Sequence, residues 1–461
     1  MGNKNYGKNM GVIALIPLLV FVLLYVGTGV VLSIQGVPMA FYQMPLPIPV
    51  AAGCITAFLL LKGNINEKFD NFVKGCADDN IIIMCIIYIL AGAFSTVAKA
   101  MGGVDSTVNL GLTLIPVQFM TAGLFIISAL IATACGTSMG TISAVVPIAM
   151  GVAEKGGLSV PIVLGAVVGG AMFGDNLSVI SDTTIAATRT QNVEMRDKFK
   201  MNFFIALPAA VITVILLLIF GKPETAVSLG ELPFDIVKVI PYIFVLVSAL
   251  AGLNVFVVLA GGIIIAGLIG IFFTDMTFLT FVGNVYDGFV GMSELFIGSL
   301  LMGGLVKLIT DAGGLQFIVD KLGKLAKNRA SGELTIAGMV SLADIAIANN
   351  TIAILVSGDI AKEISKEHKI DPRKTASLLD IFSCVFQGLV PWAAQLIVCG
   401  SLAGGAIAPV EMIPFMWYQM LLFVFAIIAV FVPKFTNIII KNDPWDWEKD
   451  MSSKKAAELS K

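Results

Sequence analysis

Two carboxylates stand inside a stretch of sequence that is otherwise apolar enough to cross a membrane. Asp175 and Asp182 lie within residues 170–184, among glycine, hydroxyl and amide side chains and between long apolar runs. An ionisable side chain within a membrane span is costly unless it is paired or hydrated, so both are candidate functional groups. Carboxylates, hydroxyls and backbone carbonyls freed by a helix break form the all-oxygen environment that a hard cation prefers. The stretch therefore predicts a cation site.

A second polar stretch precedes this one, and two more follow in the second half of the chain. Residues 136–141 read Gly-Thr-Ser-Met-Gly-Thr between apolar arms. In the second half, polar side chains gather at residues 343–351 and around a broken span that contains Pro391. Gly174 and Pro391 are helix breakers at corresponding places of the two halves. The second-half residues expected to line the same site are Asp344, Asn349, Asn350, Thr351, Asp380 and Gln387.

Protons, if they are carried, must be carried by carboxylates. The only histidine, His368, is expected in a loop between Glu367 and Lys369. A buried aspartate favours its neutral form, whereas a bound cation favours the charged form, so one aspartate can exchange a proton for a sodium ion. Asp175 and Asp182 are seven residues apart, which is about two turns of a continuous helix. The break between them can bring them closer or separate them, and the sequence leaves both outcomes open.

Structural roles compete with the functional ones at several of these positions. The hydroxyls of Thr137, Ser138 and Thr141 can instead bond back to helix carbonyls. Asp182 can cap a helix end near Arg189.

Other polar and glycine positions are expected to be structural. Glu294 and Asp311 stand near span ends, where water or the membrane interface solvates them. Lys307 is expected to extend to the aqueous surface. The glycine pairs 261–262 and 303–304 are expected to allow close helix packing.

The composition places nearly the whole chain in lipid. Of 461 residues, 57% are hydrophobic and 13% are charged, and the mean hydropathy is +0.94. Apolar runs long enough to cross a hydrocarbon core give about ten crossings, the first of which is expected to be retained rather than cleaved. The six cysteines form no CxxC pair, so no metal or disulfide chemistry is predicted. No basic footprint for nucleic acid is present.

The distribution of lysine and arginine predicts the topology. The amino terminus and residues 62–74 carry lysines, whereas residues 35–47 carry neither lysine nor arginine. The positive-inside rule therefore places the amino terminus in the cytoplasm. If every apolar run were one full crossing, the basic clusters at 189–200 and 362–374 would face outside.

Both conflicts disappear if two segments enter the membrane and return to the side they came from. These re-entrant hairpins are residues 121–152 and 334–357, and irregular backbone at membrane depth implies a shared, protein-lined site. Both termini are then cytoplasmic. Of the 29 Lys and Arg, the outside keeps only Lys99, Lys155, Lys222 and Lys238.

The sequence also repeats itself. Residues 69–73 resemble residues 286–290, and each copy is followed by an apolar span that ends at a Gly-Gly pair. By the charge count the two copies start on opposite sides, which is the inverted-repeat architecture of many secondary transporters. The predicted divisions are 1–64 (amino-terminal spans), 65–221 (first repeat), 222–279 (connecting spans), 280–433 (second repeat) and 434–461 (cytoplasmic tail). The predicted fold is an all-α polytopic membrane protein with about ten transmembrane helices, two re-entrant hairpins and broken helices.

Two motifs carry a resemblance to a known family. Residues 173–184 read F-G-D-N-L-S-V-I-S-D-T-T, and residues 136–141 precede them as G-T-S-M-G-T. Together they resemble the signature of the NhaC-type sodium/proton antiporter family, with one departure: Val179 stands where the family has proline. The resemblance covers roughly residues 65–430. The cation and proton ligands implied in the first half, with the neighbouring amide, are Thr137, Ser138, Thr141, Asp175, Asn176, Ser178, Asp182 and Thr183.

The expected function is exchange of sodium for protons across the cytoplasmic (inner) membrane by competition at Asp175 and Asp182. The alternative is a sodium- or proton-coupled transporter of an amino acid or small organic acid, because the family includes such members. A membrane-embedded enzyme is disfavoured, since no P-loop, HExxH or nucleophile elbow is present. The expected partners are sodium ions, protons, the lipid bilayer and, in the alternative, an organic solute. No cofactor is expected. A homodimer is compatible with the sequence, which does not fix the oligomeric state.

Overall fold

The computed structural model is helical throughout the part of the chain that it describes. It describes residues 10–432, except 36, 38–39, 41–42, 179–180, 224–231 and 252, together with Trp445. The predicted tail at 434–461 otherwise lies outside the described residues. The first half contains η1 (Gly11–Leu15), α1 (Ile16–Ile34), α2 (Pro47–Leu60), α3 (Ile65–Cys76), α4 (Asp79–Ala100), α5 (Gly103–Leu114), α6 (Val117–Cys135), α7 (Ser138–Gly156), α8 (Val160–Leu177), α9 (Asp182–Gln191) and α10 (Met195–Phe220). The second half contains α11 (Ile236–Leu250), α12 (Val255–Phe273), α13 (Phe278–Gly291), α14 (Ser293–Asp311), α15 (Gly314–Gly323), α16 (Arg329–Ile347), α17 (Asn350–Glu367), α18 (Pro372–Gln387), α19 (Ala394–Leu402), α20 (Pro409–Met412), η3 (Ile413–Phe415) and α21 (Trp417–Phe431).

Many of these helices are long and apolar enough to cross a membrane. Among the described residues, eight candidate spans meet that requirement, or nine if the bent pair Pro409–Phe415 and Trp417–Phe431 is counted as one more span. Large apolar side chains such as Leu130, Ile264 and Leu279 are exposed on the outer surface, where lipid would cover them. The prediction of an all-α polytopic membrane protein is confirmed.

The order of elements is repeated along the chain. A first unit of α3 to α10 and a second unit of α13 to α21 each contain two helices, a short connecting helix, a helical hairpin, a broken span and a closing helix. The short connecting helices α5 and α15 both follow a left-handed glycine, Gly102 with φ 77° and Gly313 with φ 83°. The opposite orientation of the two units across a bilayer stays a prediction, as do the predicted boundaries.

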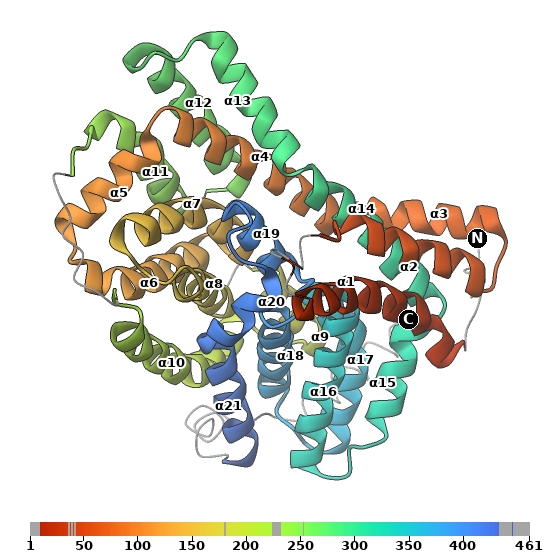
Figure 1. Cartoon of the computed structure of the whole chain (residues 1–461). Coiled ribbons are helices and arrows are strands. Elements are labelled where there is room, and N and C mark those ends of the chain that lie inside the picture. The colour runs from red at the N-terminus through yellow and green to blue at the C-terminus, as the bar shows by residue number, and fades with distance from the viewer. Residues whose placement is uncertain are drawn as a thin grey trace, which may run out of the picture.

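The two units cross each other at two glycine contacts. A Cβ on Gly92 of α4 would overlap the carbonyl of Gly288 of α13, and one on Gly75 of α3 would overlap the carbonyl of Gly303 of α14. Figure 1 shows these four helices running as one long band across the molecule. The helices α5 to α8 and α10 lie on one side of it, and α15 to α18 lie below. The expectation of close packing at residues 303–304 is thus met at Gly303.

Both predicted hairpins are present as two helices joined at a polar tip. The first joins α6 to α7 and the second joins α16 to α17. Each turns at a left-handed residue, Gly136 with φ 70° and Ala348 with φ 53°. Each second arm is then capped by a side chain: Thr137 accepts from the N–H of Gly140, and Asn349 accepts from the N–H of Ile352. The tips therefore form where the sequence places its hydroxyl and amide side chains.

Both predicted broken spans are also present, although one break is displaced. The helix α8 continues through Gly174 to Leu177 and α9 begins at Asp182, so the interruption lies between Asp175 and Asp182 as predicted but not at Gly174. Gly174 is needed for packing instead, because a Cβ there would overlap the carbonyl of Ala129 on α6. Val179 lies outside the described residues. In the second unit the interruption between α18 and α19 contains Pro391, as predicted.

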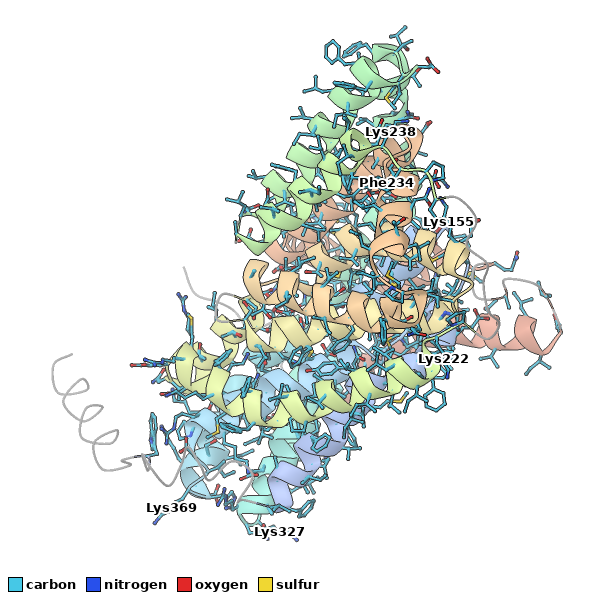
Figure 2. The ribbon with its side chains drawn as sticks, turned by 90° about the vertical axis from the view of Figure 1, so that its left-hand side faces the viewer. Lys155, Lys222, Phe234, Lys238, Lys327 and Lys369 are labelled. Atoms are coloured by element: carbon cyan, nitrogen blue, oxygen red, sulfur yellow. The ribbon has the colours of Figure 1, made fainter. Side chains whose placement is uncertain are left out.

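Lysines that are predicted to face opposite sides of the membrane lie in different regions of the molecule. Figure 2 shows Lys155, Lys222 and Lys238 along one edge, whereas Lys327 and Lys369 lie at the far, lower end. Lys155 pairs there with Asp105 at 2.6 Å. The first three lysines are predicted to face outside and the last two to face the cytoplasm, so the grouping agrees with the charge-based topology.

Candidate functional site

A cavity of about 370 Å³ lies where the hairpin tips meet the ends of the broken spans. It collects residues that are far apart in the sequence, and α4 and the start of α12 complete its walls. The predicted site residues that line it are Thr137, Ser138, Asp175, Asp182, Asn349, Asn350, Thr351 and Gln387. The structure thus brings together eight of the fourteen residues predicted from the sequence.

Asp175 is the buried carboxylate of this cavity. It is 7% exposed and belongs to the last turn of α8. Its Oδ2 accepts from the hydroxyl of Ser138 at 2.9 Å and from the backbone N–H of Ser138 at 3.4 Å. Its Oδ1 is buried and has no hydrogen-bond partner among the described residues. One oxygen therefore ties the carboxylate to the tip of the first hairpin, and the other is left for a ligand.

Asp182 has a different environment, since its side chain is exposed to the cavity. It is the first residue of α9, where its Oδ1 accepts from the N–H of Thr183 at 3.1 Å. Its Oδ2 accepts from the hydroxyl of Thr351, in the second hairpin, at 2.9 Å. The ion pair with Arg189, which was the structural alternative for Asp182, is not among the ion pairs of the described residues. Asp182 therefore joins the first broken span to the second hairpin.

Two glutamines hold the second broken span against both hairpins. Gln387 donates to the carbonyl of Ala348 at 3.1 Å and to Oε1 of Gln395 at 2.9 Å. Gln395 donates in turn to the hydroxyl of Ser138 at 3.4 Å. The Oε1 of Gln387 is buried and, like Oδ1 of Asp175, has no partner among the described residues. Two cavity-lining residues thus each hold one acceptor oxygen without a partner among the described residues, and oxygen is the ligand atom that hard cations prefer.

Four predicted residues of the first half lie behind the cavity wall. Thr141 donates to the carbonyl of Thr137 at 3.0 Å, so its hydroxyl bonds back to a backbone carbonyl, which was the structural alternative for this residue. Thr183 contacts the hydroxyl of Ser181. The carbonyl of Ser178 accepts from Thr184 at 2.8 Å, and the side chain of Asn176 donates to the hydroxyl of Tyr418 at 3.0 Å. These residues shape the break rather than line the cavity.

Two second-half carboxylates also lie outside the cavity lining. Asp380 pairs with Lys198 at 2.7 Å, with both side chains buried. Asp344 is fully buried in the last turns of α16, and neither carboxyl oxygen has a hydrogen-bond partner among the described residues. The sequence correctly marks both as buried polar groups, but it does not separate them from the residues of the cavity.

Lys198 is the residue that sequence reasoning misplaced. The charge count assigns it to a cytoplasmic basic cluster, yet it is fully buried in α10. Asn202, four residues further on, lies on the same helical face and contacts the same carboxylate at 2.7 Å. A polar residue one turn after a lysine, at the start of an apolar run, is the signal that could have found it.

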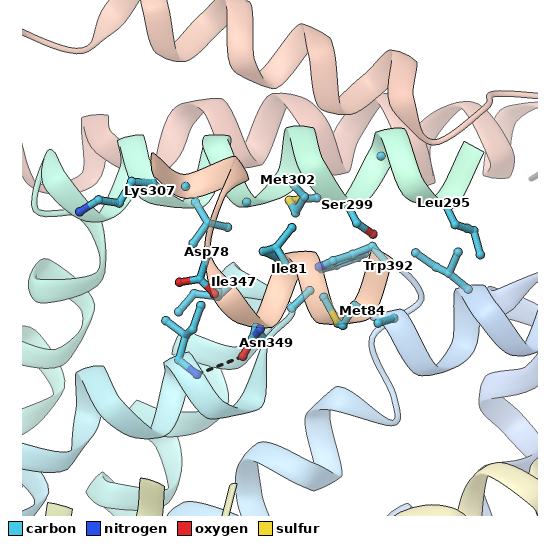
Figure 3. A pocket seen from close by; sticks show the side chains of 18 of the residues that line it. Asp78, Ile81, Met84, Leu295, Ser299, Met302, Lys307, Ile347, Asn349 and Trp392 are labelled. Atoms are coloured by element: carbon cyan, nitrogen blue, oxygen red, sulfur yellow. Dashed lines mark hydrogen bonds between the residues drawn. The ribbon is translucent and has the colours of Figure 1, made fainter. Parts of the chain in front are cut away.

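A second cavity of about 340 Å³ adjoins the first. The two share Met84, Ala348 and Asn349 as lining residues. Figure 3 shows the apolar side chains of α4 and α14 facing each other across it, with Trp392 between them. Lys307 and Asp78 lie at one end. Lys307 also pairs with Asp311 at 2.6 Å. The second cavity is thus mostly apolar and has charged groups at one end.

Comparison with known proteins extends these findings. A malate-2H⁺/Na⁺-lactate antiporter of Bacillus subtilis is 25% identical over 441 residues, which is 88% of this chain and 93% of that protein. The Na⁺/H⁺ antiporter NhaC of the same organism is 25% identical over 387 residues, 77% of this chain and 84% of the relative. The crystal structure of the Alcanivorax borkumensis YdaH transporter covers 84% of this chain and 98% of its own, with 10% identity and a TM-score of 0.46.

The helical fold and the cavity between broken helices define a multi-pass membrane transporter. Residues 5–222, which include both motifs and Asp175, match the model of the Na⁺/H⁺ antiporter family. Together with the NhaC relatives, which are 22–25% identical, this match supports the resemblance to the NhaC-type antiporters that residues 136–141 and 173–184 carry.

Proposed function

We propose that the protein exchanges sodium ions for protons at Asp175. The observation that carries this proposal is the pair of buried acceptor oxygens without partners, Oδ1 of Asp175 and Oε1 of Gln387, on residues that line one cavity. A buried carboxylate needs a compensating positive charge or a proton. Asp175 makes no ion pair among the described residues, so a sodium ion or a proton would take that role in turn.

The other cavity residues suit the same mechanism. Asp182 is exposed to the cavity and would attract a hydrated cation toward Asp175. Asn349, Asn350 and Thr351 would complete the site from the second hairpin. The sodium ion is the transported substrate here and not a resident cofactor.

Exchange can be measured with purified protein in proteoliposomes that contain a pH-sensitive dye. Addition of sodium should move protons, whereas potassium should not. Asp175→Asn should abolish exchange in a folded protein, because an amide side chain can neither bind nor release the exchanged proton. Asp105→Asn is the matched control, because Asp105 is exposed and its ion pair among the described residues is with Lys155, outside the cavity. Folded wild-type protein without sodium-dependent proton movement would rule out the proposal.

Coupled transport of a small organic solute is the second candidate. The adjoining apolar cavity favours it, since about 340 Å³ beside the cation cavity is more space than a single ion requires. The lactate and malate in the name of one relative belong to the same class of solute. Uptake of labelled monocarboxylates and amino acids, driven by a sodium gradient in the same proteoliposomes, distinguishes the two functions.

We place the protein in the cytoplasmic membrane with both termini in the cytoplasm. In that orientation the end of the second cavity that carries Lys74, Asp78 and Lys307 belongs to the cytoplasmic side. The solute or ion would reach the site from that side in this conformation.

A further inference from the structure

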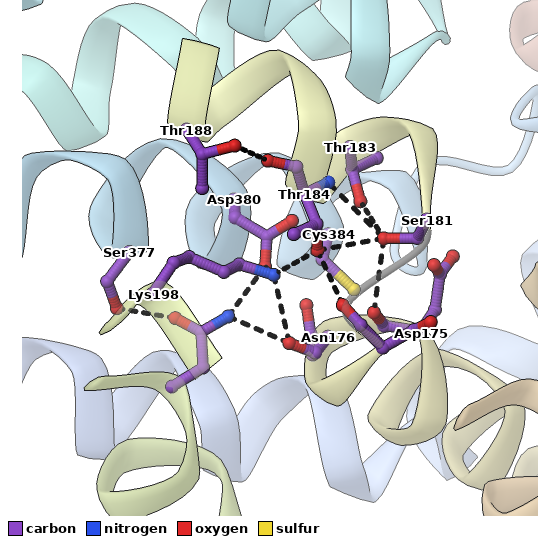
Figure 4. A network of polar contacts seen from close by, with 12 residues as sticks. Asp175, Asn176, Ser181, Thr183, Thr184, Thr188, Lys198, Ser377, Asp380 and Cys384 are labelled. Atoms are coloured by element: carbon purple, nitrogen blue, oxygen red, sulfur yellow. Dashed lines mark hydrogen bonds and ion pairs between the residues drawn. The ribbon is translucent and has the colours of Figure 1, made fainter. Parts of the chain in front are cut away.

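Lys198 is a buried lysine beside the candidate cation site. Its side chain is fully buried on α10, and its ammonium group contacts three acceptors. These are Oδ2 of Asp380 at 2.7 Å, the carbonyl of Asn176 at 3.0 Å and the hydroxyl of Thr184 at 2.6 Å. Figure 4 shows the ammonium group at the centre of this network. An ammonium group has three N–H donors, so its hydrogen-bonding capacity is filled.

The three contacts join segments that the break separates. Asn176 belongs to the last turn of α8, and Thr184 belongs to the first turn of α9. Asp380 lies on α18, in the second unit. Asn202 reinforces the same junction, because its amide donates to the carbonyl of Asn176 at 2.9 Å and to Asp380 at 2.7 Å. Lys198 therefore fastens both sides of the first break to the second broken span.

The residues that Lys198 contacts are close, along the same helices, to Asp175 and Gln387, the two residues whose oxygens have no partner among the described residues. Asn176 is the neighbour of Asp175 in the chain. Asp380 and Gln387 lie seven residues apart on α18, which is about two turns along one face of the helix. A link between Asn176 and Asp380 thus fixes the position of α8 relative to α18. The separation of Asp175 from Gln387 depends on that position.

We propose that Lys198 is a positioning residue for the cation site. Its tethered ammonium group pairs with Asp380 and sets the spacing between Asp175 and Gln387, so that their oxygens fit one dehydrated cation. The inference rests on the proposed function, because it concerns the same site. A merely structural ion pair predicts something different: replacing both of its charges by apolar side chains would be neutral or stabilising and would leave cation affinity unchanged.

The test compares three variants of the full chain in proteoliposomes. Lys198→Met leaves Asp380 buried without its cation, and the double variant K198M/D380L removes both charges. Lys200→Met is the matched control, since Lys200 lies on the same helix but is exposed and pairs with Asp197 at 3.4 Å. The measurements are the KM for sodium, the maximal exchange rate, and the melting temperature with and without sodium.

In the double variant we expect a melting temperature without sodium close to that of the wild type. We also expect a KM for sodium raised about tenfold, which corresponds to ion binding weakened by about 1.4 kcal/mol. Lys200→Met should keep the wild-type KM. A folded double variant with the wild-type KM would overturn the inference. If neither Lys198 variant folds, Thr184→Val decides, because it removes one contact of the ammonium group: a raised KM supports the inference, and an unchanged KM overturns it. Failure of the proposed function is distinguishable, since the wild type would then show no sodium dependence.

Discussion

At the scale of single residues, the candidate site is chemically asymmetric. The first unit supplies two carboxylates, Asp175 and Asp182, at the two ends of its break. The second unit supplies two amides, Gln387 and Gln395, at similar places around its own break. One half therefore contributes negative charge and the other contributes neutral oxygen atoms. Such a mixture suits a monovalent cation, which needs less negative charge than a divalent ion does.

The amide half of the site can be tested at Gln387. Gln387→Leu should raise the KM for sodium about tenfold, because it removes a neutral ligand oxygen worth about 1.4 kcal/mol. Gln419→Leu is the matched control: Gln419 is also buried and also has an Oε1 without a partner among the described residues, but it does not line the cavity. Equal sodium KM values for the two variants would show that Gln387 does not bind the ion.

At the scale of elements, polar side chains cap the helix after the first break, whereas glycines allow the helix before it to pack closely. The break after α8 forms at residues 178–181, where Ser181 caps α9 by accepting from the N–H of Thr184. Two glycines of α8 lie earlier and allow its close contact with α6: a Cβ on Gly170 would overlap the backbone of Phe125, and one on Gly174 would overlap that of Ala129. The position of Asp175 therefore depends on how closely α6 and α8 approach.

This dependence predicts a large effect of one methyl group. Gly174→Ala should destabilise the protein by about 1–3 kcal/mol, as expected for overpacking of a close helix contact, and should impair exchange. Gly123→Ala on α6 is the control, because a Cβ there has no neighbour within 4 Å. Thermal unfolding in detergent measures both. The close approach would be refuted if the two variants melted at the same temperature.

At the scale of the whole molecule, two units of the same element order enclose one site. Each break contacts both hairpins: Asp175 and Gln395 bond to Ser138 in the first hairpin, while Asp182 and Gln387 bond to Thr351 and Ala348 in the second. The glycine crossings of α4 with α13 and of α3 with α14 hold the units together on the other side of the cavity. Neither unit contains a complete site alone.

The orientation of this assembly in the membrane gives a labelling prediction. In a cysteine-free background, Lys222→Cys should react with a membrane-impermeant maleimide added to intact cells. Lys369→Cys and Lys327→Cys should react only after the membrane is permeabilised, because all three positions are exposed and the last two belong to the predicted cytoplasmic face. Labelling of Lys222→Cys and Lys369→Cys from the same side would contradict the predicted topology.

Much of the fold could be predicted because lipid imposes simple rules on a sequence. Apolar length marks the spans, lysine and arginine mark the loops, and both hairpins follow from basic clusters that would otherwise face outside. The break between Asp175 and Asp182 is also present as predicted, but the helix-breaking role expected for Gly174 is wrong. Glycine can break a helix, but Gly174 lies within α8, where its lack of a side chain allows close packing against Ala129. The sequence does not distinguish a helix-breaking glycine from a packing glycine.

The sequence by itself determined that this protein is a polytopic membrane protein with paired polar interruptions, and it marked Asp175 and Asp182 as the candidate carboxylates of the site. These are local properties, since they follow from the cost of placing each residue in lipid. Only the tertiary structure decided which polar residues share the cavity. It places Asp380 with Lys198 and leaves Asp344 outside, whereas Gln387 joins Asp175. Pairing between helices depends on their rotation and crossing, which no single segment encodes.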